Sequence, residues 1–387
     1  MLRSPLLPIF LTIFVDVFGM TMIIPVLPFF AQHLGASEVV TGALLATYAA
    51  CQLVSGPILG RISDRVGRKP TLLASQLGTM VGFTVLGFSH TLWMLFLSRF
   101  ISGSTAGNLT VAQAYIADVT KPEDRTRAYG LVGVAFGTGF LIGPALSGEL
   151  AERYGYGVPG LAAAGLSLLS FVLTATLLPA RKPLTVPDTR GRVAAFQQLF
   201  QRPLPRRRLI EFFFFSLSFA TLTGGLSFYL QRRFSFTMKN VGHLYAYSGL
   251  IGGMVQGGLI GRMAKKLGEQ RIAIMGFALM AVGYAFLGAL YTLPMLLVVV
   301  AFSSIGSAVV RPVLTTLITK SVGPHEQGTV LGVSQTLSCL ALITGPLLAN
   351  TFIGQGRLAA YGLSAAIFAA IGVGIGLRDA PPPETVS

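Results

Sequence analysis

The feature that most constrains this fold is a series of long apolar runs that recurs from one end of the chain to the other. The chain has 387 residues, of which 52% are hydrophobic and only 11% are charged, whereas average soluble proteins carry about 25% charged residues. Each run reaches about eighteen residues or more, which is enough to cross a bilayer as a helix. A membrane barrel would instead show alternating segments of ~10 residues, and no such alternation is visible. The sequence therefore predicts an all-α membrane protein.

Breaks in hydropathy divide the chain into twelve predicted transmembrane helices. They cover residues 6–31, 39–60, 71–89, 92–118, 128–150, 158–179, 209–231, 241–261, 272–291, 294–319, 328–352 and 358–377. The predicted domains are an N-terminal six-helix bundle over 1–179, a cytoplasmic linker over 180–208, and a C-terminal six-helix bundle with a short tail over 209–387. Within the linker, a short helix on the membrane surface is expected near 193–200.

The distribution of lysine and arginine predicts that both termini lie in the cytoplasm. With the N-terminus inside, the cytoplasmic segments hold 22 of these residues and the outer segments hold 5, as the positive-inside rule requires. The net charge of +15 is then explained by loops that face anionic lipid headgroups, and no nucleic-acid partner is expected. We predict an integral protein of the plasma (inner) membrane that works as a monomer.

A short charged stretch between spans two and three has a second copy half a chain later. Residues 60–70 read GRISDRVGRKP and residues 261–271 read GRMAKKLGEQR, with matched glycine and basic positions at a spacing of 201. The Gly-Pro pair at 143–144 also recurs, at 345–346, with a spacing of 202. These matches predict two related six-helix halves, with the substrate site at their interface near the middle of the membrane.

The first copy of this stretch is predicted to form a tight turn beside a close helix contact. Gly60 is expected to let the end of span two pack closely against a neighbouring helix, and Gly67 is expected to make the turn. Asp64 is expected to face the N-terminus of span eleven, where a carboxylate is favourable.

These charges suggest a conformational gate. We hypothesise that Asp64, with Arg65 and Arg68, latches the two halves together on the cytoplasmic side in one state and releases them in the other. The alternative is that the charges only set topology, which suits the two arginines but not an acid in a positive-inside loop. The second copy has Lys265 in place of Asp64, so the latch should be strong in one half only.

Asp16 is the only acid near the centre of a predicted span. A carboxyl group in that environment is costly to ionise, so it can carry a proton. Arg99, in the outer part of span four, is the natural counter-charge. We predict that Asp16 couples transport to protons and that Arg99 tunes it. The alternative is a static buried ion pair that only holds spans one and four together.

Span five carries small residues on one face and a proline. Glycines four apart, at Gly139 and Gly143, allow close helix packing, and Pro144 removes a backbone hydrogen bond; Gly130 precedes them in the same span. A bendable, tightly sealed helix between the two halves is one interpretation, and ordinary small-residue packing is the other. The sequence does not separate the two.

Polar side chains in otherwise apolar spans are candidates for lining the substrate cavity, although hydrogen bonding between helices explains each one equally well. The candidates are Tyr48, Gln52, Asn108, Gln113, Gln256, Arg311 and Gln335. Arg311 is the strongest, because a cation within a span has few structural roles. It is expected to bind an anionic or zwitterionic substrate, or to reach the cytoplasmic rim.

Other chemistry is not indicated. The chain has no phosphate-binding loop, and its four histidines are scattered without metal-ligand spacing. Cys51 and Cys339 both lie within apolar runs, where burial as small apolar residues is expected. We therefore predict no catalytic residue, cofactor or metal, and not an enzyme. Energy for transport must come from an ion gradient or from the gradient of the substrate itself.

Several motifs resemble those of the major facilitator superfamily. Residues 60–69 resemble its loop 2–3 signature, and residues 97–103 are similar to its span-four signature. Residues 130–144 resemble the span-five signature of the drug:proton antiporters, which usually ends in Gly-Gly where this chain has Ser-Gly. Residues 16–28 resemble span one of the twelve-span drug antiporters, and residues 114–118 are close to the tetracycline-exporter branch.

The resemblance covers essentially the whole chain and implies a secondary active transporter. It implies alternating access by rocking of two halves, with protons and a small amphipathic compound or drug moving in opposite directions, as in multidrug efflux and antibiotic resistance. The tetracycline-exporter branch usually carries a further acid in span three, and residues 71–88 contain none. A metabolite or sugar transporter, either a symporter or a uniporter, is the alternative, and a membrane receptor that transports nothing is a more remote one.

Overall fold

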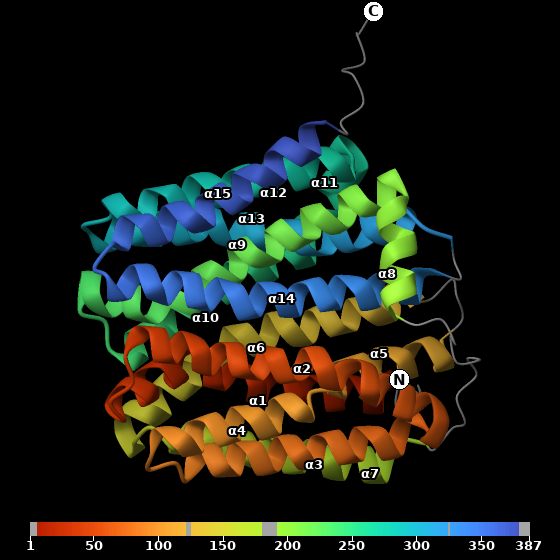
Figure 1. Cartoon of the computed structure of the whole chain (residues 1–387), viewed down its shortest axis with the longest axis horizontal. Helices are drawn as coiled ribbons and strands as arrows, with labels where there is room; N and C mark the ends of the chain where they lie inside the picture. The colour runs from red at the N-terminus through yellow and green to blue at the C-terminus, as the bar shows by residue number, and fades with distance from the viewer. Residues whose placement is uncertain (1–5, 121–124, 180–191, 324–325, 379–387) are drawn as a thin grey trace, which may run out of the picture. The chain divides into compact units, whose positions relative to one another are not determined.

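The computed structural model describes residues 6–120, 125–179, 192–323 and 326–378. These residues form helices joined by short connections, with no strand among them (Figure 1). The prediction of an all-α protein is confirmed.

The helices of the first half follow the predicted spans. They are α1 (Leu6–His33), α2 (Glu38–Val66), α3 (Arg68–Gly87), α4 (Leu92–Ser104), α5 (Asn108–Val119), α6 (Arg125–Tyr154) and α7 (Val158–Leu177). The predicted span four is divided between α4 and α5, because the chain leaves the helix near Thr105 and re-enters it after Gly107.

The second half repeats this order after a short additional helix. Its elements are α8 (Arg192–Gln201), α9 (Pro203–Phe234), α10 (Met238–Met254), a π-helix (Val255–Leu259), α11 (Ile260–Leu267), α12 (Glu269–Phe286), a 3₁₀ turn (Leu287–Ala289), α13 (Leu293–Lys320), α14 (Gln327–Gly354) and α15 (Leu358–Leu377). The predicted span eight is interrupted by the π-helix. Among the described residues, nine helices are long and apolar enough to cross a membrane. Together with α3 and the two interrupted spans they match the twelve predicted spans.

The predicted linker is partly helical. Helix α8 confirms the helix that was expected near 193–200. Helix α9 begins at Pro203, inside the predicted linker, because proline favours the first turn of a helix and hydropathy marks only the apolar part of a helix. Residues 180–191 lie outside the described part of the chain.

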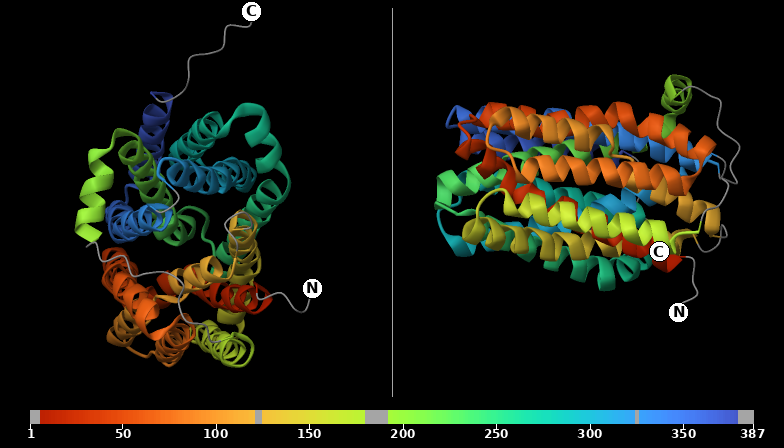
Figure 2. Two further views of the ribbon diagram at one scale, coloured as in Figure 1. Left: turned by 90° about the vertical axis from the view of Figure 1, so that its right-hand side faces the viewer. Right: turned by 90° about the horizontal axis from the view of Figure 1, so that it is seen from below.

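By its contacts the chain divides into two compact units. Unit 1 is Met1–Thr189 with Ser227–Leu250, and unit 2 is Arg190–Leu226 with Ile251–Ser387. Within each unit the helices run side by side as a bundle (Figure 2). This division differs from the predicted domains, because the end of α9 and most of α10 pack with the helices of unit 1. The boundaries drawn from the sequence repeat remain a prediction.

Helix α1 is central to the core of unit 1. Its first half contributes Ile9, Ile13 and Val17 to one buried apolar cluster, and its second half contributes residues from Ile23 onward to another. Asp16 lies between Ile13 and Val17 along α1 and is itself half-buried.

The same helix pair packs in the same way in both halves. A Cβ atom on Gly143 of α6 would contact Thr21 of α1, and a Cβ atom on Gly345 of α14 would lie 2.7 Å from the backbone nitrogen of Thr221 in α9. Each glycine therefore allows the close approach that the repeated Gly-Pro motif leads one to expect.

Candidate functional site

The turn between α2 and α3 is built on Gly67. Its φ is +113°, in a region that side chains other than glycine rarely occupy. The Gly67 N–H donates to the carbonyl oxygen of Ser63 at 3.1 Å, and the hydroxyl of Thr71 donates to the carbonyl oxygen of Gly67 at 2.9 Å. The predicted tight turn at Gly67 is confirmed.

The prediction for Gly60 is wrong. Among the described residues, no heavy atom lies within 4 Å of where a Cβ atom on Gly60 would be, so this glycine makes no close helix contact. Span two was predicted to end here, but α2 continues to Val66. Gly60 is therefore an interior helical residue that no described heavy atom of a neighbouring helix approaches, and not the end of a helix.

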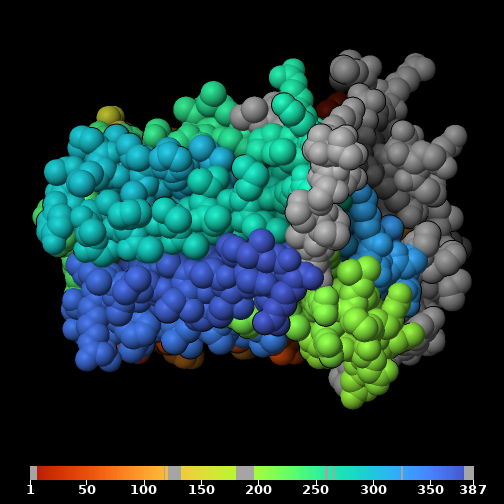
Figure 3. Space-filling view, turned by 90° about the horizontal axis from the view of Figure 1, so that it is seen from above, coloured from red at the N-terminus to blue at the C-terminus, as the bar shows by residue number. Residues whose placement is uncertain are grey.

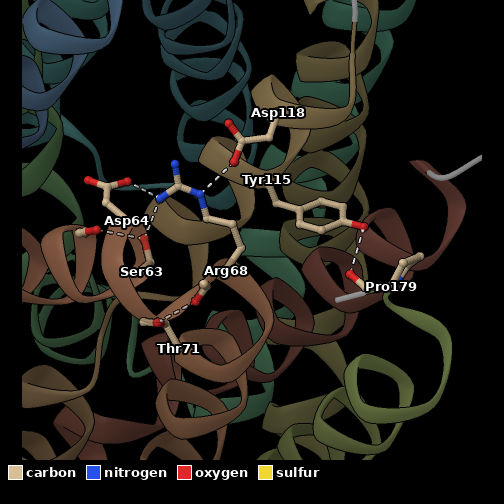
Figure 4. Close-up of polar contacts among 9 residues, drawn as sticks. Ser63, Asp64, Arg68, Thr71, Tyr115, Asp118 and Pro179 are labelled. Carbon is tan, nitrogen blue, oxygen red and sulfur yellow. Dashed lines mark hydrogen bonds and ion pairs between the residues drawn. The ribbon is translucent and has the colours of Figure 1, made fainter. Parts of the chain in front are cut away.

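Arg68 organises the charged groups of this turn. Its Nε donates to Asp118 Oδ2 at 2.8 Å, its Nη1 donates to the Ser63 hydroxyl at 2.6 Å, and the same Nη1 pairs with Asp64 (Figure 4). The side chains of Arg68 and Asp118 are each 6% exposed, and that of Asp64 is 27% exposed. One guanidinium therefore joins two carboxylates and ties α2 and α3 to α5.

Asp118 is a site residue that the sequence reasoning missed. It belongs to the motif at 114–118, but the local sequence indicates no role for it, because its partner Arg68 is fifty positions away in sequence. Nearby, the Tyr115 hydroxyl donates to the carbonyl oxygen of Pro179 at 3.5 Å (Figure 4). Arg65, which is predicted to act with Arg68, is exposed, whereas the acids that pair with Arg68 are Asp64 and Asp118.

The second copy of the turn keeps this geometry and reverses the charges. The turn glycine is Gly268, with a φ of +80°. Glu269 takes the position of Arg68 and Lys320 takes the position of Asp118, and the two form an ion pair at 2.6 Å. Here the lysine side chain is 64% exposed and the glutamate side chain is 26% exposed. The same two elements are therefore joined by an ion pair of opposite polarity.

A second hydrogen bond also repeats between the copies. Lys69 Nζ donates to the carbonyl oxygen of Ala175 at 2.8 Å, and Gln270 Nε2 donates to the carbonyl oxygen of Gly376 at 2.9 Å. Both donors follow the first residue of their helix, and both acceptors lie at the end of the last helix of their half. The repeat predicted from the sequence thus extends to individual contacts.

Asp16 lies among neutral polar groups from three helices. Ser170 of α7, Gln76 of α3 and Asn108 of α5 are the hydrogen-bonding side chains around its carboxyl group. Gln76 Nε2 in turn donates to Ser170 Oγ at 2.8 Å and to Thr174 Oγ1 at 3.0 Å. Asp16 Oδ1 is buried and accepts no hydrogen bond from any described residue. The carboxyl group is therefore enclosed by polar groups that carry no charge.

The structure does not bring Arg99 to Asp16. Arg99 Nη2 donates to the Ser98 hydroxyl at 3.1 Å, and its guanidinium carbon lies 5.8 Å from the centre of the Phe83 ring. Its electrostatic neighbour is Tyr48. Because span four is divided, it is Asn108 of α5 that approaches Asp16, while Arg99 belongs to α4.

Helix α6 packs closely on two sides, against α1 near its own Gly139 and against two glycines of α10. The Thr21 hydroxyl of α1 donates to the carbonyl oxygen of Gly139 at 2.9 Å. On α10, a Cβ atom on Gly242 would contact the carbonyl of Pro144, and one on Gly249 would lie 2.8 Å from the backbone nitrogen of Leu141. Gly130 is in α6 but outside the residues whose packing is described. The bending predicted for this helix remains a prediction.

Comparison with known proteins identifies the family. The sequence matches the model of the Major Facilitator Superfamily over residues 9–346 and 257–387. The chain belongs to the Major Facilitator Superfamily. The resemblance inferred from its motifs is thereby confirmed.

Two bacterial resistance proteins and one solved structure illustrate the relationship. This chain is 30% identical over 381 residues to the tetracycline resistance protein, class C, of Escherichia coli, and the match covers 95% of this chain and 94% of that protein. It is 28% identical over 340 residues to multidrug resistance protein 1 of Bacillus subtilis (strain 168), and the match covers 87% of this chain and 86% of that protein. The crystal structure of the human organic anion transporter MFSD10 shares the fold, with a TM-score of 0.78 over 97% of this chain and 99% of that chain at 22% identity.

Ion pairs join α6 to α10 and α2 to the end of α9. The sequence did not predict these pairs. Glu149 of α6 pairs with Lys239 of α10 at 2.9 Å, and Glu38 of α2 pairs with Arg232 of α9. The sequence showed these side chains only as charges near loops. These pairs help to explain why residues 227–250 belong to unit 1.

The remaining candidates for lining the substrate cavity fall into two groups. Tyr48, Gln52 and Gln113 are half-buried in unit 1, whereas Gln256, Arg311 and Gln335 are exposed in unit 2. Gln256 lies in the π-helix, a feature that is frequent at functional sites, and donates to the carbonyl oxygen of Ala308 at 3.3 Å. Gln335 Nε2 lies 3.9 Å from the sulfur of Cys339. Hydropathy gave no sign of the π-helix.

Proposed function

We propose that this integral membrane transporter exports small amphipathic compounds in exchange for protons. The observation that carries the proposal is the position of Asp16, a half-buried acid in the middle of α1 whose hydrogen-bonding neighbours Ser170, Gln76 and Asn108 are all neutral. An ionisable group within a transmembrane bundle commonly marks a proton pathway. The tetracycline and multidrug resistance relatives support drug export as the transport reaction.

In this proposal Asp16 alternates between a protonated and a charged form. A proton from outside neutralises the carboxyl group, so the site can be carried across the membrane without an uncompensated charge. Release of that proton to the cytoplasm restores the charge, and the substrate moves outward in the same cycle. Arg99 tunes Asp16 from α4 without contacting it, and its own neighbours are Phe83 and Tyr48.

The gate in this proposal is the cluster of Asp64, Arg68 and Asp118. Two carboxylates share one guanidinium, so the cluster carries one net negative charge. That charge suits the positive end of a helix, and α14 begins at Gln327, next to the predicted start of span eleven. We propose that Asp64 pairs with this N-terminus in one conformation only.

The substrate site and the orientation complete the proposal. We assign Tyr48, Gln52, Gln113, Gln256 and Gln335 to the substrate site as polar lining groups, and Arg311 as the group that meets an anionic or zwitterionic part of the substrate. Both termini lie in the cytoplasm, and one chain is the functional unit.

The test is transport by the purified protein in liposomes under an imposed pH gradient, with a panel of cationic, zwitterionic and anionic drugs that includes tetracycline. Wild-type protein should show drug-dependent proton flux for at least one compound. Asp16→Asn should bind that compound but lose proton-driven transport. Glu269→Gln, which also converts an acid to an amide, should transport normally.

Two results would contradict the proposal. If Asp16→Asn exports against a gradient with unchanged proton dependence, Asp16 has no part in coupling. If wild-type protein shows no proton-linked flux for any compound, a uniporter or a receptor is the better description.

A further inference from the structure

A cationic cavity lies at one end of unit 2, where α9 begins and α15 ends. Its volume is about 380 Å³, within the range of about 300–1,000 Å³ that is common for small-molecule sites. Its lining residues are Arg206, Arg207, Ile210, Ile375 and Arg378. Figure 3 shows the deep-blue end of α15 beside the light-green segment of α8 and the start of α9.

The lining residues are ordered by depth. Ile210 follows Arg206 and Arg207 by one helical turn on α9, and Ile375 precedes Arg378 by one turn on α15, so each isoleucine shares a helix face with an arginine. The two helices run in opposite directions. On both, the arginines therefore lie at the end of the helix and the isoleucine lies one turn further into the bundle. The cavity has a charged rim and an aliphatic inner part.

A buried hydrogen-bond network holds the helices on either side of this cavity. Arg208 Nη1 pairs with Glu211 at 2.9 Å and donates to Gln270 Oε1 at 2.5 Å. Gln270 Nε2 donates to the carbonyl oxygen of Gly376, which adjoins Ile375. Arg208 and Glu211 are buried, so α9, α12 and α15 are joined by groups that have little access to solvent. The helix ends that line the cavity are therefore held together by the fold.

The arginines that line the cavity favour an anionic ligand. Glu211 pairs with Arg208, and the five lining residues are three arginines and two isoleucines. Guanidinium groups bind phosphate oxygens with paired, charge-assisted hydrogen bonds. A small soluble anion would use only the rim, whereas a phospholipid would place its phosphate at the rim and its acyl chain along the isoleucines.

We propose that this cavity binds an anionic phospholipid, with the phosphate held by Arg206, Arg207 and Arg378 and the start of an acyl chain packed against Ile210 and Ile375. Basic pockets between transmembrane helices on the cytoplasmic side are suited to such headgroups, and the distribution of basic residues predicts that this end faces the cytoplasm. The site does not depend on which compound the protein transports.

The experiment is native mass spectrometry of the full-length protein in detergent, titrated with phosphatidylglycerol or with phosphatidylcholine of the same acyl chains. Inorganic phosphate and glycerol 3-phosphate are added as competitors. The variant is R206Q/R207Q/R378Q. The control is R262Q/K266Q/R271Q, which removes three exposed basic charges from α11 and α12 of the same unit.

We expect wild-type protein and the control to retain phosphatidylglycerol in preference to phosphatidylcholine. The cavity variant should lose affinity for phosphatidylglycerol on the order of a hundredfold, as three arginines near a lipid surface would contribute. I210S/I375S should bind phosphatidylglycerol several-fold more weakly. Arg378→Gln alone, at the exposed end of α15, gives a smaller loss and keeps the test valid if the triple variant does not fold.

Three outcomes would overturn the proposal. Equal retention of phosphatidylglycerol by wild-type protein and the cavity variant would show that the cavity binds no lipid. Equal losses in the cavity variant and the control would reduce the effect to general surface charge. Displacement by inorganic phosphate or glycerol 3-phosphate at the concentration of the lipid, with no effect of I210S/I375S, would assign the cavity to a soluble anion.

Discussion

The two charged turns of this protein, at 60–70 and 261–271, share a backbone but not a charge pattern. In both, a glycine with positive φ separates two helices, and the next residue forms an ion pair with the end of span four in the first copy and of span ten in the second. In the first copy the basic residue is Arg68 and the acid is Asp118. In the second copy the acid is Glu269 and the base is Lys320. An ion pair joins the equivalent helices in both copies, although the acid and the base have exchanged places. The fold therefore explains the presence of the pair but not which helix carries the acid.

Burial separates the two copies energetically. Arg68 and Asp118 are nearly inaccessible to solvent, whereas Lys320 is largely exposed. A buried pair is costly to break, because the remaining charge loses its partner in a poorly solvated place, whereas an exposed pair contributes little. Only the first copy adds a second acid, Asp64. The comparison therefore separates a structural role that both copies share from a gating role that we assign to the first.

The largest expected effect comes from removing the buried arginine. Arg68→Met leaves the Asp118 carboxylate without its partner and should cost about 3–5 kcal/mol of stability, measured as the free energy of unfolding of the purified protein in denaturant. Lys320→Met in the second copy should cost about 0–1 kcal/mol. Similar losses for the two variants would remove the energetic difference between the copies.

An intermediate effect is expected at the turn glycines. Gly67→Ala and Gly268→Ala each force a side chain into backbone geometry that is available almost only to glycine, with a cost of about 1–3 kcal/mol. The two costs should be similar, because both turns have positive φ, and unfolding in denaturant measures them. A cost at Gly67 with none at Gly268 would show that the backbones of the two turns are not equivalent.

The smallest effect is a gain in stability. Gly60→Ala places a methyl group where no described heavy atom lies within 4 Å, and alanine is favoured over glycine inside a helix by about 0.5–1 kcal/mol. Gly261 has the same open surroundings, so Gly261→Ala serves as the matched variant. Thermal unfolding of both should show equal or higher midpoints. A loss of stability at Gly60 would restore the close-packing role that the structure removes.

Local sequence signals predicted the helices and turns well. The apolar runs, the helix within the linker and the tight turn at Gly67 all follow from residue types and spacing over short distances. The role predicted for Gly60 failed because hydropathy shows where a helix stops being apolar and not where it ends, and α2 continues through Arg61 and Asp64 to Val66.

Contacts between segments that are distant in sequence could not be predicted from local sequence patterns. The partnership of Arg68 with Asp118 joins α3 to α5, and nothing in either local segment indicates it. The neighbours of Asp16 depend on the break between α4 and α5, which brings Asn108 close and leaves Arg99 elsewhere. The internal repeat predicted some long-range features, because positions related by 201 or 202 residues form equivalent contacts in the two halves.

The measurement that tests this account most directly is drug-dependent proton flux by Asp64→Asn and Glu269→Gln in liposomes, at matched levels of inserted and folded protein. If the gate belongs to the first copy of the turn, Asp64→Asn inserts normally but its flux falls close to background, and Glu269→Gln keeps the flux of the wild type. Normal flux in Asp64→Asn, or an equal loss in both variants, would contradict the assignment of the gate to the first copy.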